Sequence, residues 1–178
     1  MKEIKLHVGC GEKFIPGWIH IDLKKYPHID YVTDASDLHV FENNSVDLIY
    51  ACHLLEHFKR CDIDLVLKEW YRVLKPGGIL RLSVPDFSAL VEVYNKYKDM
   101  GIIMGPLYGR GNPGNQHYIA FDFRYLKKRL QLIGFDKVRL WDWRISDIKD
   151  YDDYSQSYIP HLCKNDGILV SLNVEAIK

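Results

Sequence analysis

The chain has 178 residues, and its 24 lysines and arginines balance 24 aspartates and glutamates, so the formal net charge is zero. Hydrophobic residues make up 47% of the sequence and charged residues 27%, which is typical of a folded globular protein. The balanced charge argues against a protein that coats nucleic acid, because such a protein needs a basic surface to displace counterions from phosphates. The length predicts a single domain over residues 1–178.

Membrane insertion and export are not indicated. No apolar run approaches the ~18–20 residues of a membrane-spanning helix, and the first residues lack the apolar core of a signal peptide. The four cysteines form no CxxC pair and have no disulfide-framework spacing, so we expect reduced thiols and a cytoplasmic location.

Short apolar runs alternate with amphipathic segments along the chain. The amphipathic segments predict helices, because their apolar residues recur at spacings of three and four; they are residues 62–75, with Asp62 as N-cap, 87–98, with Leu90, Val91 and Tyr94 on one stripe, and 123–133, ended by Gly134. The apolar runs predict strands at residues 4–8, 18–21, 29–33, 46–51, 79–84, 137–143 and 168–177. Such alternation favours a largely parallel sheet wrapped by helices.

Two segments interrupt this alternation. Residues 99–118 hold five glycines and two prolines, Pro106 and Pro113, and have no clear period. Residues 145–166 are polar and rich in tyrosine and aspartate. Long irregular stretches in a compact domain are usually functional loops or lids.

Residues suited to a cofactor follow three of the early strands. Gly9 and Gly11 permit a tight turn and a close approach of backbone to a ligand. Asp22 ends the second strand, where a carboxylate can accept hydrogen bonds from ribose hydroxyls, and Asp34 ends the third, where it can accept one from an adenine amino group. Since parallel strands end at one edge of a sheet, these residues predict a cofactor site there.

Five motifs follow one another in the first half of the chain: LHVGCG (6–11), WIHIDL (18–23), TDASDL (33–38), VDLIYACHLLEHF (46–58) and LKEWYRVLKPGGILRLSVPD (67–86). As a linked set they resemble the class I S-adenosylmethionine-dependent methyltransferases, specifically the small type 11-like group. The resemblance covers residues 4–86 strongly and continues weakly through residues 132–138. It implies an α/β, Rossmann-like fold with a mostly parallel seven-stranded sheet, helices on both faces and an antiparallel last strand.

The resemblance also implies S-adenosylmethionine as cofactor and a site for it. The glycines would border the methionine part of the cofactor, and the aspartate that ends the second strand would hold its ribose hydroxyls. The residues after the third strand would contact its adenine, and those after the fourth strand would line its other side. His7 stands where family members usually carry an acidic residue for the ammonium group. The implied cofactor residues are Gly9, Gly11, Asp22, Asp34, Ala35, Cys52 and His53.

Methyl transfer to an alcohol needs a base, and His57, Asp86 and His117 are the candidates near the strand ends. Asp86 is equally suited to cap the helix that begins at residue 87, and His57 to a core or capping role. We expect residues 99–118 to form a Gly-rich loop over the acceptor. Relatives of this type often occur in surface-polysaccharide biosynthesis, so the resemblance suggests a small hydroxylated acceptor such as a sugar, with no nucleic-acid or membrane partner; we allow for a homodimer.

Other functions stay open. A non-catalytic module that binds the cofactor and acts through a partner would suit the unusual His7. Tyr94 and Lys98 have the Tyr-x-x-x-Lys spacing of dehydrogenases, but Gly9 and Asp22 are closer than the ~20 residues of a dinucleotide fingerprint. Residues 53–57 fit the H-x-x-E-H spacing of metalloproteases, with Glu69 as a third ligand, but they match the methyltransferase motif, so we expect no metal.

Overall fold

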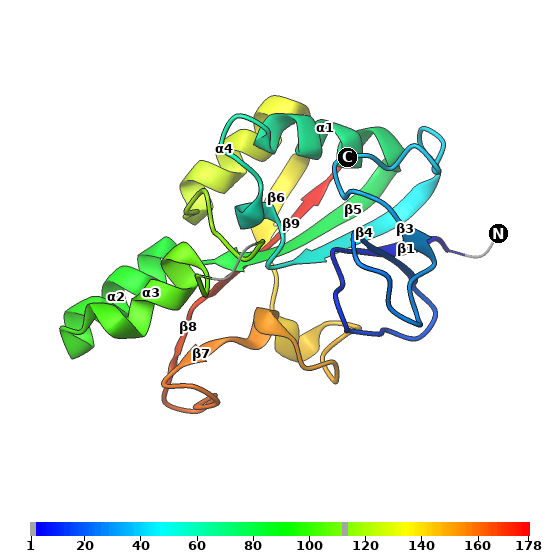
Figure 1. Cartoon of the computed structure of the whole chain (residues 1–178). Helices are drawn as coiled ribbons and strands as arrows, with labels where there is room; N and C mark the ends of the chain where they lie inside the picture. Colours follow the sequence, from blue (N-terminus) through cyan, green and yellow to red (C-terminus); the bar gives the residue numbers. More distant parts are fainter. Residues whose placement is uncertain (1–2, 112–113) are drawn as a thin grey trace.

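The computed structural model describes residues 3–111 and 114–178, so Pro113, one of the two prolines noted above, lies outside the described residues. Its centre is a seven-stranded sheet in the order β3-β2-β1-β4-β5-β9-β6 (Figure 1). The strands are β1 (Lys5–Val8), β2 (Ile19–Asp22), β3 (Tyr31–Val32), β4 (Val46–Cys52), β5 (Leu74–Pro85), β6 (Asp136–Leu140) and β9 (Ser171–Ile177).

Strand direction follows the fold predicted from the sequence. The pairs from β3 to β5 are all parallel, whereas β9 runs antiparallel between β5 and β6. The mostly parallel sheet and the antiparallel last strand are therefore confirmed. The predicted strand 168–177 is divided in two, because β8 (Ile168–Leu169) leaves the main sheet and pairs with β7 (Tyr158–Ile159).

One face of the sheet is covered by α1 (Ile63–Val73) and α4 (Phe123–Ile133), which lie side by side (Figure 1). Their buried stripes fill the main core, where each large apolar side chain contributes roughly 1.5–3 kcal/mol. Gly134 ends α4 in the left-handed conformation, as predicted. Asp62 occupies the N-cap position of α1, but its side chain makes no capping hydrogen bond.

The opposite face carries a second core that is rich in aromatic residues. Ile15, Trp18 and Tyr50 pack there with Ile148, and Trp141 and Tyr151 pack against them. Only six residues separate Gly11 from Trp18, too few for a regular crossover helix. The helical residues on this side are the short 3₁₀ helices η2 (Trp143–Ile145) and η3 (Tyr154–Gln156), in the gold and orange segment of Figure 1.

A pair of helices follows β5 and projects from the sheet: α2 (Phe87–Tyr97) and α3 (Met100–Tyr108) (Figure 1). The expectation of an irregular segment at 99–118 is wrong for its first half, because Asp99 caps α3 and Ile103 packs against α2. The predicted apolar stripe of α2 is also corrected, because the packing of α3 against α2 decides which of its side chains are buried. Val93 is buried beside Leu90, while Val91 and Tyr94 are 42% and 38% exposed.

No helix in the described parts of the chain is long and apolar enough to cross a membrane.

Candidate functional site

The turn after β1 is held against the end of β2. Gly9 and Gly11 have positive φ angles of 64° and 56°, and a Cβ on Gly9 would lie 2.6 Å from the Leu54 side chain. The amide of Gly11 donates to Oδ2 of Asp22 at 2.8 Å, and the amide of Lys24 donates to Oδ1 at 2.8 Å. Each carboxylate oxygen has a further lone pair, so Asp22 can hold this turn and still accept bonds from a ligand.

The turn after β3 is fixed from both sides. Oδ1 of Asp34 accepts hydrogen bonds from the amide and hydroxyl of Ser36, at 2.8 and 2.6 Å. The carbonyl of Ala35 accepts a 2.7 Å bond from Nε1 of Trp70, a fully buried residue of α1. The parallel pairing of β1, β2 and β3 places both turns at one edge of the sheet.

The two predicted cofactor residues at the end of β4, Cys52 and His53, face different surroundings. Burial raises the pKa of the Cys52 thiol well above its ordinary value, and this residue packs against the aromatic core with Tyr50. His53 takes a positive φ of 49° and lines a cavity. Its Nε2 lies 3.2 Å from Oγ of Ser171, and burial lowers its pKa to about 3.

The cavity measures about 310 Å³ and adjoins the carboxyl ends of the strands. Both of the segments that interrupt the helix–strand alternation form its walls. Nη2 of Arg110 donates to the hydroxyl of Tyr154 at 2.9 Å and joins the two walls. Lining residues come from the turn after β4 (His53, His57), from residues 99–118 (Pro106, Arg110, His117) and from residues 145–166 (Tyr154, Tyr158, His161).

Two of the three candidate bases meet in this cavity. The rings of His57 and His117, from segments 60 residues apart, have centroids 4.8 Å apart, and burial lowers the pKa of both. Asp86, by contrast, is not among the described residues that line the cavity. Its carboxylate accepts a 2.9 Å bond from the amide of Ser88, so it caps α2.

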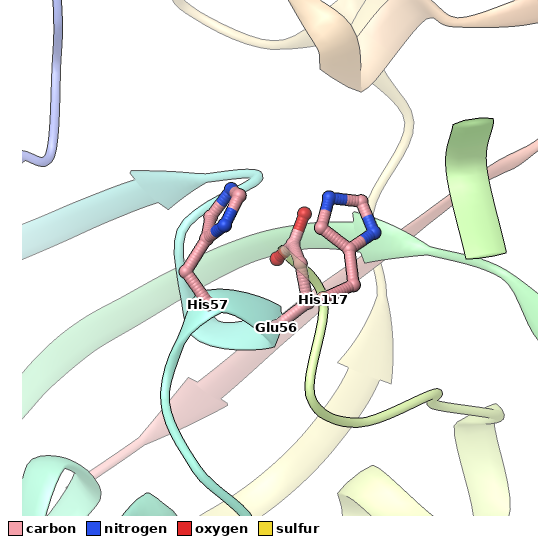
Figure 2. Close-up of side chains that lie close together, drawn as sticks. All are labelled: Glu56, His57 and His117. Carbon is pink, nitrogen blue, oxygen red and sulfur yellow. The ribbon is translucent and has the colours of Figure 1, made fainter. Parts of the chain in front are cut away.

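Glu56 entered the sequence analysis only within the H-x-x-E-H pattern of residues 53–57 and was not among the candidate site residues. It is 0% exposed, and its carboxylate lies near the rings of His57 and His117 (Figure 2). Neither carboxylate oxygen has a hydrogen-bond partner among the described residues, and burial raises its pKa to about 8. The signals in the sequence are its place in that pattern and an acidic residue among the apolar residues Leu54, Leu55 and Phe58.

The protease-like arrangement of residues 53–57 is not formed. Two histidines four apart share a face only on an α-helix, but the helical part here is the three-residue 3₁₀ helix η1 (Leu55–His57). Glu69, the proposed third ligand, instead binds Arg72 and the amide of Leu38. The dehydrogenase-like pair also lies elsewhere, since Tyr94 is exposed on α2 and Lys98 ends that helix.

His7 points into the aromatic core. It is 2% exposed, its ring stacks on Tyr50, and Nδ1 has no hydrogen-bond partner among the described residues. Burial, with the nearby His20 and His28, lowers its pKa to about 3. The ring is therefore neutral at ordinary pH and offers no charge to an ammonium group.

Comparison with known proteins agrees with this geometry. Residues 6–82 match the family model described as a methyltransferase domain. The chain is 31% identical over 121 residues to the ubiquinone/menaquinone biosynthesis C-methyltransferase UbiE of Pseudoalteromonas translucida, covering 62% of this chain and 47% of that protein. It is 29% identical over 143 residues to the demethylmenaquinone methyltransferase of Staphylococcus haemolyticus, covering 73% and 59%. The chain thus spans about half the length of these curated relatives.

Solved structures share the fold. A SAM-dependent methyltransferase from Archaeoglobus fulgidus superposes with a TM-score of 0.62 at 16% identity, covering 99% of this chain and 86% of that one. A 1,6-didemethyltoxoflavin-N1-methyltransferase from Burkholderia thailandensis, solved with its substrate and S-adenosylhomocysteine, gives 0.60 at 16% identity, covering 98% and 70%.

Proposed function

Because the chain belongs to the class I S-adenosylmethionine-dependent methyltransferases of the type 11 group, we propose that it transfers a methyl group from S-adenosylmethionine to a small hydroxylated acceptor. The observation that carries this proposal is the position of the cavity. His53, which directly follows β4, lines the cavity. The cavity therefore adjoins the strand ends at which the family binds its cofactor.

The transfer is an in-line displacement. An acceptor oxygen forms a bond to the methyl carbon while the carbon–sulfur bond breaks, and the electron pair of that bond goes to sulfur. Alignment of the reacting atoms contributes ~7–11 kcal/mol in well-ordered sites. The hydroxyl proton must also leave, and His57 and His117 are the predicted bases that line the cavity.

The lining holds both apolar and polar side chains, and its polar part supports a hydroxylated acceptor. Arg110, Asn115 and Tyr154 offer donors and acceptors to several hydroxyl groups of one molecule. The quinones in the names of the curated relatives are a second acceptor class, and they favour a more apolar wall.

A methylation screen tests the proposal. Labelled S-adenosylmethionine is incubated with the protein and with two panels, one of sugars and sugar nucleotides and one of quinols. We expect label in a member of the first panel. Label only on a ring carbon of a quinol would reject transfer to an acceptor oxygen, and cofactor binding without transfer to either panel would favour the non-catalytic module.

Replacement of Asp22 by alanine is expected to weaken S-adenosylmethionine binding at least about tenfold, since each hydrogen bond to a charged group contributes ~1.5–3 kcal/mol. Calorimetric titration measures the affinity. Asp22→Asn keeps one oxygen for the Gly11 amide and separates loss of the ligand contact from loss of the turn. Asp136→Ala, an exposed change on β6, is the matched control. Equal affinity in wild type and Asp22→Ala would remove Asp22 from the site.

A further inference from the structure

Three potential metal ligands converge on the cavity wall. One ligand atom from each of Glu56, His57 and His117 lies within 4.8 Å of the other two. They come from two segments, η1 after β4 and the loop after α3, and the carboxylate lies near both rings (Figure 2). The amide of Tyr118 donates to the carbonyl of Glu56 at 2.8 Å and ties these segments together.

Both imidazoles are held in the tautomer that a metal requires. Nδ1 of His57 lies 3.0 Å from the carbonyl oxygen of Gln116, and Nδ1 of His117 lies 2.9 Å from that of Pro106. A carbonyl oxygen only accepts hydrogen bonds, so each Nδ1 carries the proton and each Nε2 keeps its lone pair. Metal-binding histidines are oriented in this way, by a hydrogen bond from the other ring nitrogen to a carbonyl or carboxylate.

Glu56 lacks the partners that a buried carboxylate needs. Nδ1 of His53 is 3.4 Å from Oε1, but the contact does not have hydrogen-bond geometry. A fully buried acid without a donor or a cation is costly, and a bound metal ion is one of the few arrangements that satisfies it.

We propose that Glu56, His57 and His117 bind one divalent transition-metal ion, with Zn²⁺ as the matching metal. Two histidines and a glutamate are a donor set of catalytic zinc sites, in which three protein ligands leave the fourth position open. The two imidazoles favour Zn²⁺ over Mg²⁺ or Ca²⁺, which prefer oxygen ligands. The sequence alone led us to expect no metal, because His117 is distant along the chain and residues 53–57 matched another motif.

The open position faces the cavity, since His57 and His117 both line it. An oxygen donor from a bound molecule would complete the coordination. This step rests on the proposed function: the molecule would be the hydroxylated acceptor, and the cation would make its hydroxyl more acidic. The imidazoles would then act as ligands, and the proton of the hydroxyl would pass to solvent water rather than to His57 or His117.

Metal binding is tested without cofactor or acceptor, so its result does not depend on the proposed function. The chelator-stripped chain is titrated with Zn²⁺ by calorimetry, and Co²⁺ binding is followed by visible absorption. We expect one equivalent per chain, and an affinity at least about 100-fold weaker in Glu56→Gln and in His117→Ala, because even partners outside the ligand set change metal affinity 10–100-fold. Circular dichroism and thermal unfolding establish that both variants are folded.

His161→Ala is the matched control, because it removes an exposed histidine of the same cavity that lies outside the three-residue cluster. Its metal affinity is expected to equal that of the wild type. Absence of saturable binding, or affinities in Glu56→Gln and His117→Ala within a few-fold of wild type, would overturn the proposal. A loss in His161→Ala as large as in His117→Ala would do the same, because it would indicate binding by surface histidines.

Discussion

Replacement of Gly109 by alanine is expected to lower methyl transfer at least about 100-fold and to leave the affinity for S-adenosylmethionine unchanged. Gly109 has a φ of 81°, and a Cβ there would collide with the carbonyl group of Asn115. Gly109 bridges to Gln116, and the amide of His117 donates to the carbonyl of Tyr108 at 3.2 Å. The substitution therefore opens the base of the loop that carries His117, and a displacement of about 1 Å can cost 10²-fold in rate.

Steady-state transfer of labelled methyl groups measures this loss, and calorimetry measures cofactor affinity. Gly105→Ala is the matched control, because it adds the same methyl group to the same segment where no atom lies within 4 Å of the new Cβ. We expect it to change turnover less than about tenfold, in contrast to the 10²-fold cost of a displaced group. Equal turnover in Gly109→Ala and wild type would mean that the position of His117 does not matter to the reaction.

The sheet was predictable because its signal is local. Short apolar runs ended by Gly9, Asp22 and Asp34 predicted the strands and the edge at which they end, and β4 lies where its apolar run does. β5 includes the predicted run 79–84 but begins at Leu74, inside the end of the predicted helix 62–75. The buried face of α1 follows from spacing alone, since Val66, Leu67 and Trp70 form one stripe.

The second half of the site was not predictable because it depends on contacts distant in sequence. The glycines at 101 and 105 have low helix propensity, so the sequence did not predict α3. This helix is stabilised by the packing of Ile103 on α2 rather than by helix propensity. That packing also decided that Val93 and not Val91 is buried. The approach of His117 to His57 depends on the bridge at Gly109, a feature that no spacing in the sequence reveals.

Glu56 shows a related limit. Its sequence neighbours favour burial. That its carboxylate has no hydrogen-bond partner among the described residues is known only once the surrounding segments are placed. The same is true of His7, whose apolar neighbours predicted a strand but whose unpartnered Nδ1 and stacking on Tyr50 appear only in the folded chain.

The free energy of unfolding is expected to fall as the pH drops from about 6.5 to about 3, in part because of His7. The folded chain lowers the pKa of His7 from 6.5 to about 3 through burial, with His20 and His28 adding repulsion. Between these values the unfolded chain binds a proton on His7 that the folded chain does not. The stabilisation is therefore present above pH 6.5 and is lost progressively as the pH approaches 3, at up to about 1.4 kcal/mol per pH unit.

His7→Phe is expected to remove this part of the pH dependence. Phenylalanine keeps the stacking on Tyr50 and cannot bind a proton, and Nδ1 has no hydrogen bond among the described residues to lose. Urea unfolding from pH 7 to pH 4 gives the two profiles, and their difference isolates His7 from His20 and from the carboxylates, which titrate in both proteins. His39→Phe, at an exposed histidine, is the control and should follow the wild type. Parallel curves would mean that folding leaves the pKa of His7 unshifted, and would show that His7 is not held neutral in the core.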